Sequence, residues 1–256
     1  MILTADYHTH TPFSHGKNTV AENAFAAKEK GLKELGIADH GFAHMAFGIR
    51  RKDLAKLKEE AAVAEKEYGV RVLVGVEANL LGLNGKTDLK ESDYPNFDFF
   101  LCGYHLLVKT ATASDFFSML VRNSLKMKPN DSVVKRNTKT YINAIKNNPI
   151  DAITHLSYRF PCDAIEVAKC AADYGTYIEL NSKKTHLTDE ELMEMTAKTS
   201  VRFLINSDAH AASRVGDKRI VEEQLARLSF PTERIDNVEG RLPAFRFQAY
   251  KLRQGL

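Results

Sequence analysis

The sequence is poor in cysteine and has no long apolar run. Its three cysteines, Cys102, Cys162 and Cys170, are odd in number and form no CxxC pair, which disfavours a disulfide framework and indicates reduced thiols. No apolar run approaches the ~20 residues that span a bilayer. The N-terminal segment MILTADYHTH has neither the basic nor the apolar region of a signal peptide. We therefore expect a soluble, cytoplasmic protein with no membrane partner.

The sequence also has little excess charge of either sign. Its 36 basic and 33 acidic residues leave a net charge of +3, and the longest basic block lies within residues 49–52. A protein that binds nucleic acid usually carries a stronger basic patch, so a nucleic-acid partner is not expected. A hydrophobic fraction of 44% is typical of a globular protein. We expect one domain over residues 1–256. The sequence does not decide between a monomer and a homo-oligomer.

Short apolar stretches alternate with longer amphipathic ones along most of the chain. This alternation is typical of a parallel sheet, and about seven strand–helix units in a chain of this length favour a closed (β/α) barrel. Residues 106–137 form a longer connection, which we predict to be a helical insertion over the mouth of the barrel. The predicted strands cover residues 2–7, 35–38, 70–76, 97–103, 150–154, 176–180 and 201–205. The predicted helices cover residues 19–30, 53–68, 138–146, 164–174 and 189–198.

Seven of the nine histidines follow a predicted strand directly or lie in the loop after one. Active sites of such barrels are built at the carboxyl ends of the strands. Two pairs are spaced by two residues, so in an extended chain both members face the same pocket. Two carboxylates occupy equivalent positions. The candidate ligands are His8, His10, His15, His40, Glu77, His105, His155, Asp208 and His210.

Each candidate ligand taken alone has a simpler interpretation. A lone histidine at a strand end is more often a hydrogen-bonded structural residue, and Glu77 or Asp208 could be a helix N-cap or an ion-pair partner. Asp39 fits a supporting or capping role better than that of a ligand. Seven histidines and two carboxylates at one end of a sheet are an improbable coincidence, however. Imidazole and carboxylate together are the ligand set of zinc, iron or manganese.

The motifs that carry these residues resemble those of the PHP (polymerase and histidinol phosphatase) superfamily. They are YHTHTPFSHG, ADHG, GVEAN, GYH, THLS and NSDAH, and they occur in order over about residues 5–215. The resemblance is greatest to stand-alone phosphatases of the histidinol-phosphatase kind. It implies a distorted (β/α)7 barrel. The second motif is Asp39-His40, whereas many histidinol phosphatases have Glu-His, so the substrate stays open.

The resemblance also implies three divalent transition-metal ions, with zinc favoured and manganese or iron as alternatives. His8, His10, Glu77 and Asp208 would hold one ion. Glu77 would bridge to a second ion, held also by His105 and His155. The third ion would be held by His15, His40 and His210.

This centre predicts hydrolysis of a small phosphomonoester by a metal-activated hydroxide, with Glu77, Asp208 and His210 in the catalytic group. L-histidinol phosphate is one candidate substrate. Three divalent ions against two carboxylates and a hydroxide leave a charge of roughly +3, which suits a dianionic ester. The alternatives are a phosphodiesterase or 3′–5′ exonuclease, hydrolysis of the amidohydrolase kind, and a metal-stabilised binding module.

Three basic residues in loops after the strands are candidates for binding the phosphate. Arg159 lies four residues after His155, and Arg214 lies four residues after His210. A guanidinium matches two phosphate oxygens at once. Lys183 is a weaker third candidate. The two other histidines, His44 and His186, are better explained as solvated loop residues.

Overall fold

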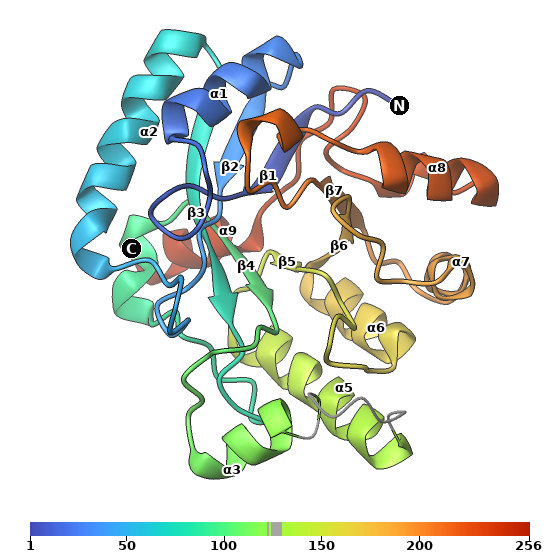
Figure 1. Ribbon diagram of the computed structural model, residues 1–256. Coiled ribbons are helices and arrows are strands. Elements are labelled where there is room, and N and C mark those ends of the chain that lie inside the picture. The colour runs from blue at the N-terminus through green and yellow to red at the C-terminus, as the bar shows by residue number, and fades with distance from the viewer. Residues whose placement is uncertain (122, 124–129) are drawn as a thin grey trace.

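The structure is a computed structural model that describes residues 1–121, 123 and 130–256. Within these residues, seven strands pair in the order of the chain, and every pair is parallel (Figure 1). The arrangement confirms the predicted seven-stranded α/β barrel. The strands are β1 (Ala5–Thr9), β2 (Glu34–Ile37), β3 (Arg71–Asn79), β4 (Phe99–Gly103), β5 (Ala152–Ile153), β6 (Tyr177–Asn181) and β7 (Phe203–Asn206).

The barrel closes between its first and last strands at the end that carries the histidines. There Thr9 pairs with Ala209, and the backbone of Ala209 bonds both to the carbonyl of His8 and to the amide of His10. Farther from the histidines, the buried side chain of Asn237 joins β1 and β7 by hydrogen bonds to the backbone of both strands. Its amide donates to the carbonyls of Ala5 and Ile205 at 2.8 and 2.6 Å. The seam is therefore closed partly by backbone and partly by side chains, since the N–H of Tyr7 also donates to Oδ1 of Asn206.

Helices surround the sheet (Figure 1), and four of the seven main helices begin and end within one residue of the predicted bounds. Thr19 and Glu22 form a capping box at the start of the first helix, and Gly69 ends the second in a left-handed conformation. The two C-terminal helices were not predicted. The main helices are α1 (Val20–Glu29), α2 (Leu54–Tyr68), α5 (Asp131–Asn147), α6 (Ala164–Tyr174), α7 (Asp189–Lys198), α8 (Arg219–Leu228) and α9 (Arg246–Gln254). None of the described helices is both long enough and apolar enough to cross a membrane.

The predicted insertion at residues 106–137 is only partly helical in the described part of the chain. Its first residues pair with the loop after β2, since the amide of Met45 donates to the carbonyl of Leu107. A short helix, α3 (Ala113–Asp115), and a π-helical turn over Phe116–Val121 follow. Residues 122 and 124–129 lie outside the described residues. The end of the segment belongs to α5, which starts at Asp131 and not at residue 138.

The interior of the barrel is apolar around Tyr7 and polar at the end that carries the histidines. Its apolar layer contains Tyr7, Phe99 and Tyr177, with Phe245 packed against them just before α9. A bulge in β1 then changes the direction of the next side chain, because Asp6 to Thr9 on β1 oppose only Leu35 to Ile37 on β2. His8 can therefore face the barrel interior directly after Tyr7.

Candidate metal centre

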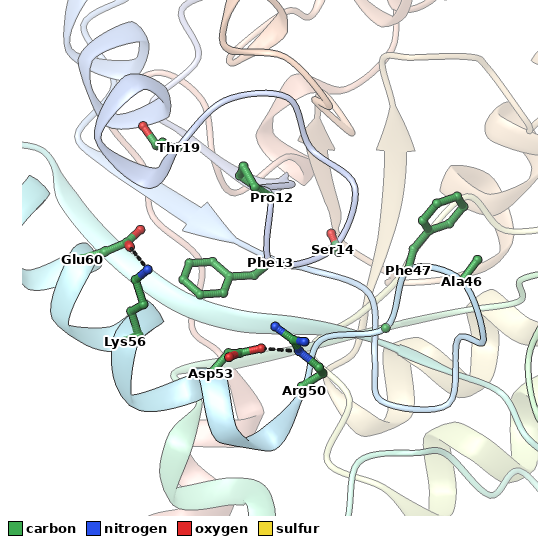
Figure 2. Close-up of a pocket in the computed structure, with 11 residues that line it drawn as sticks. Pro12, Phe13, Ser14, Thr19, Ala46, Phe47, Arg50, Asp53, Lys56 and Glu60 are labelled. Carbon is green, nitrogen blue, oxygen red and sulfur yellow. Dashed lines mark hydrogen bonds and ion pairs between the residues drawn. The ribbon is translucent and has the colours of Figure 1, made fainter.

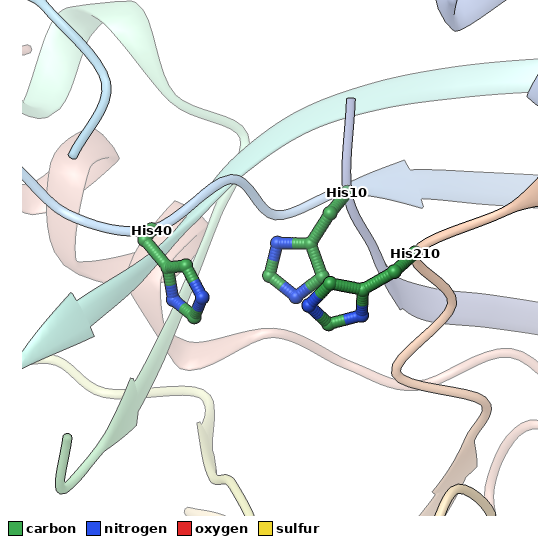
Figure 3. Close-up of side chains that lie close together, drawn as sticks. All are labelled: His10, His40 and His210. Atoms are coloured by element: carbon green, nitrogen blue, oxygen red, sulfur yellow. The ribbon is translucent and has the colours of Figure 1, made fainter. Parts of the chain in front are cut away.

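Four histidine rings from three segments pack against one another at the mouth of the barrel. The ring of His10 lies 4.6 Å from that of His40 and 4.3 Å from that of His210, measured between centroids (Figure 3). His15 completes the group, at 4.2 Å from His210 and 4.9 Å from His40. These residues follow β1, β2 and β7. The three strands are neighbours in the barrel although β7 is far from the others in the sequence, so their carboxyl ends bring the group together.

Glu77, at the carboxyl-terminal half of β3, lies at the centre of the candidate ligands and is fully buried. Its Oε1 is 2.8 Å from Nε2 of His155, 3.2 Å from Nε2 of His105 and 3.3 Å from Nε2 of His8. Its Oε2 is 2.8 Å from Nδ1 of His40. The two oxygens therefore face different histidines, so this carboxylate is in a position to serve more than one ion.

Asp208, two residues after the end of β7, is the second carboxylate of the cluster. Its Oδ1 lies 3.5 Å from Nε2 of His10, 3.2 Å from Nδ1 of His210 and 3.2 Å from Nζ of Lys183. The backbone of Asp208 is left-handed, with φ of 49°. Such a conformation is costly for a residue other than glycine, and strain of this kind gathers at functional sites.

The donor set fits divalent transition metals on its own chemistry. Among the described residues, three groups bring ligand atoms within 4.8 Å of one another: His8, His10 and Glu77; His10, His40 and His210; and His40, Glu77 and His105. Several buried ring nitrogens there approach carboxylates or other rings without forming a hydrogen bond, including Nε2 of His8, both nitrogens of His10 and both of His105. Buried polar atoms are normally bonded, so unpaired lone pairs in such a group fit the ligands of a cation.

The protonation of four groups in the cluster favours ligation, whereas the neighbouring carboxylates raise the pKa of His8 and His155. Burial would raise the pKa of Glu77 and Asp208, but the surrounding histidines outweigh it and hold both pKa values well below the usual range. Burial lowers the pKa of His10 well below its ordinary value, and it lowers that of His105 to about 4. Near neutral pH the carboxylates are therefore ionised and these two rings are neutral, which is the state that binds a metal.

The comparison with known families agrees with this geometry. The model of the PHP domain matches residues 6–183, which span β1 to β6 and most of the candidate ligands. The chain belongs to the PHP domain family. The membership confirms the resemblance that the sequence motifs indicate.

Relatives of this PHP protein match it over nearly its whole length. A probable phosphatase of Acetivibrio thermocellus is 30% identical over 245 residues, covering 93% of this chain and 92% of the relative. A probable phosphatase of Caldanaerobacter subterraneus subsp. tengcongensis is 32% identical over 244 residues, covering 92% and 87%. These relatives support the prediction that the chain hydrolyses phosphoric esters.

A solved structure shares the fold at low sequence identity. It is the histidinol phosphate phosphatase of Lactococcus lactis subsp. lactis, complexed with zinc, L-histidinol and phosphate. The TM-score is 0.59 at 13% identity, and the match covers 90% of this chain and 95% of that one. The similarity bears out the barrel architecture.

Glu179, in the middle of β6, supports the PHP centre and was not predicted from the sequence. Its Oε1 lies 2.6 Å from Nδ1 of His8, and its Oε2 accepts the backbone N–H of His155 at 2.8 Å. Asn206 and Asn181 donate to the same two oxygens, at 3.1 and 3.0 Å. A histidine whose Nδ1–H is held by a carboxylate presents Nε2 as a lone-pair donor. The only sequence signal was a glutamate inside an otherwise apolar strand.

The loop that carries His155 is held in an unusual conformation. His155, Ser157 and Arg159 all have positive φ, at 33°, 69° and 52°. Gly103 on the adjacent strand leaves the space that this loop needs, because a Cβ there would lie 2.7 Å from the His155 ring. Strained backbone of this kind gathers at binding and catalytic sites.

Asp39 takes the supporting role that the sequence favours. Its carboxylate accepts the N–H and hydroxyl of Thr11 at 2.8 and 2.6 Å and the hydroxyl of Ser14 at 2.5 Å. It thereby holds the loop between His10 and His15. The neighbouring His40 is left to face Glu77.

The three predicted phosphate-binding residues lie in different surroundings. Lys183 is half-exposed and contacts Asp208 and His210, with Nζ at 3.2 Å from an atom of each. The guanidinium of Arg214 is held by Asp217 at 2.7 Å and donates to the carbonyl of Ser182. Arg159 is exposed, and its Nε donates to the hydroxyl of Tyr158 at 3.1 Å. The structure thus brings Lys183 into the cluster itself, while the two arginines lie in the loops around it.

The two remaining histidines are closer to the cluster than expected for solvated loop residues. The ring of His44 stacks on that of His40 at 5.0 Å, and its Nδ1 accepts the N–H of Phe47. The ring of His186 lies 6.0 Å from that of His155. Both are partly buried, and burial lowers the pKa of each to about 4.

Proposed function

We propose that this PHP protein is a metal-dependent phosphomonoesterase that acts on a small phosphorylated metabolite. The observation that carries the proposal is the convergence of seven imidazoles on the two carboxylates Glu77 and Asp208, several with unpaired buried lone pairs. The proposed cofactor is three divalent transition-metal ions, zinc first, with manganese or iron as alternatives. A cluster of this size provides more ligands than one ion accepts from a protein.

We assign the ligands of each ion as the resemblance to the family implies. His8, His10, Glu77 and Asp208 would hold the first ion, and Glu77 would join it to a second with His105 and His155. The third would be held by His15, His40 and His210. The shared members of the three close groups, His10, His40 and Glu77, support neighbouring ions and not isolated ones.

Bound ions of this kind would supply positive charge to the phosphoryl oxygens and an ionised water near neutral pH. Glu77 would keep its negative charge between them, because the surrounding histidines hold its pKa far below neutrality. Asp208 and His210 are partly exposed, with 11% and 21% of their side chains accessible, and we place the reacting phosphate beside them. Lys183 also lies beside them, with its ammonium fixed by the same two residues, so it can donate to a phosphoryl oxygen.

L-histidinol phosphate is the first substrate to test, because the Lactococcus lactis enzyme of the same fold is complexed with L-histidinol and phosphate. Phosphodiester and amide hydrolysis are the competing activities. The experiment is a screen of phosphorylated metabolites with zinc- or manganese-loaded protein, with single-stranded DNA and simple amides as controls. Release of phosphate from monoesters is expected. Exclusive cleavage of DNA or amides by the loaded protein would contradict the proposal.

Glu77→Ala tests the metal centre directly. Loss of a carboxylate shared by two ions should lower the zinc content by more than one ion and abolish turnover, as measured by elemental analysis and phosphate release. Glu166→Ala is the matched control, since the half-exposed side chain of Glu166 on α6 pairs only with Lys169 among the contacts described. Wild-type zinc content and turnover in Glu77→Ala would refute the bridging role.

A further inference from the structure

A groove beside the metal centre is not used by the proposed chemistry. It has a volume of about 540 Å³ and lies between the loop after β1 and the loop after β2, extending along α2 (Figure 2). Both loops also carry candidate ligands, His15 in the first and His40 in the second. The volume is within the range of sites that hold small molecules. The groove is therefore in the right place to receive the part of a substrate that extends from the cluster.

Phe47 lies at the end of the groove nearest the histidines. Its ring stacks on that of His15, with centroids 4.4 Å apart and planes inclined by 23°. The ring of His44 also lies 5.3 Å from it, between centroids, and 39% of the residue stays exposed. A large aromatic side chain that is held in place but not covered provides a flat surface for another ring. Phe13, which is half-buried, lines the same groove farther along (Figure 2).

The charged residues of the groove balance one another. Arg50 pairs with Asp53 at 2.6 Å, and Lys56 pairs with Glu60 at 3.8 Å (Figure 2). Two cations and two anions leave no net charge, so the groove offers no electrostatic advantage to a second phosphate. It suits an organic group without a second anionic charge, with polar atoms that can bond to either member of a pair.

We propose that the groove binds the organic part of the phosphomonoester and that Phe47 selects esters with a flat ring in that part. This inference rests on the proposed phosphatase function and specifies its substrate class. The phosphate would lie at the histidine cluster, and the ring would stack on the exposed surface of Phe47. Phe47 is thus a specificity-determining residue and not a ligand.

The test compares three esters of primary alcohols, which have similar leaving groups: ethyl, 2-cyclohexylethyl and 2-phenylethyl phosphate. Wild-type protein should have the highest kcat/KM for the phenyl ester. Phe47→Leu keeps an apolar side chain but removes the flat ring, and it should lower the ratio of kcat/KM for phenyl over cyclohexyl ester by about two- to tenfold. Phe47→Trp should keep that ratio. Zinc content is measured for every variant.

The Phe47→Trp variant also gives a binding measurement, because the chain contains no other tryptophan. Its fluorescence should change on addition of 3-phenylpropylphosphonate, which cannot be hydrolysed, and change less with propylphosphonate. An unchanged phenyl-to-cyclohexyl ratio in Phe47→Leu, or an equal loss for all three esters together with lost zinc, would overturn the inference, since Phe47 would then only support His15. Failure of zinc-loaded wild-type protein to hydrolyse any phosphomonoester would overturn the proposed function as well.

Discussion

Glu179→Gln should weaken metal binding although Glu179 is not a candidate ligand. The glutamate has two donors at each oxygen: His8 and Asn206 at Oε1, and the His155 backbone and Asn181 at Oε2. Glutamine has the same shape but only one oxygen. Whichever way its amide turns, its NH₂ group faces two donors that it cannot accept from.

Both orientations of the glutamine amide damage the centre. If the NH₂ group faces His8, the ring can bond to it only by accepting at Nδ1, which places its proton on Nε2 and removes the lone pair for the metal. If the NH₂ group faces His155, a buried backbone N–H loses its partner in a loop that is already strained. Changes to carboxylates that support a histidine ligand typically cost ten- to hundredfold in metal affinity. This corresponds to about 1.4–2.7 kcal/mol.

The assay is a titration of metal-free protein with zinc in competition with a chromogenic chelator. Glu179→Gln should show one ion bound ten- to hundredfold more weakly, while Glu166→Gln on the exposed face of α6 should match the wild type. The reasoning would be refuted if Glu179→Gln bound the full number of ions with wild-type affinity. An equal loss in Glu166→Gln would also refute it, because the effect would then not depend on His8.

Three further predictions concern other parts of the molecule. Arg159→Ala and Arg214→Ala should each lower kcat/KM for a phosphomonoester by roughly ten- to hundredfold with unchanged zinc content, because a charged hydrogen bond to phosphate is lost; wild-type kinetics in the double variant would exclude an arginine clamp. Hydrogen bonds from Arg219, with Arg214 nearby, lower the pKa of Asp217 to about 2, below its unfolded value near 3.9, so its carboxylate stabilises the fold above about pH 4 and loses this effect as the pH falls towards 2. Asp217→Asn should therefore cost at most about 2 kcal/mol in urea unfolding at pH 6 and progressively less below pH 4, and a constant difference would contradict the pKa. Ser229→Gly should raise the free energy of unfolding by about 1 kcal/mol, because Ser229 ends α8 with a left-handed φ of 49°, whereas Gly175→Ala at φ 67° after α6 should lower it; effects of the same sign would rule out backbone strain as the cause.

Much of the fold could be predicted because its signals are local. The capping box at Thr19, the left-handed Gly69 and the short apolar runs depend on neighbouring residues, and the structure places α1, α2 and the seven strands close to the predicted positions. The helices α8 and α9 were missed. Neither has a side-chain cap at its N-terminus, and the docking of α9 depends on distant partners such as Asp151, which accepts the N–H of Phe247.

The sequence by itself determined which residue types follow the strands, and parallel strands direct those residues to one end of the barrel. That was sufficient to group His8, His10, Glu77 and Asp208 as candidate ligands from the sequence alone. Which atoms face which was decided only by the tertiary structure. The bulge in β1 that turns His8 inward depends on pairing with β2, and Glu179 reaches His8 only because the barrel closes. Phe47 is exposed beside His15 because two loops far apart in the chain pack together. Side-chain direction and burial arise from contacts between distant segments, and no local pattern of residues contains them.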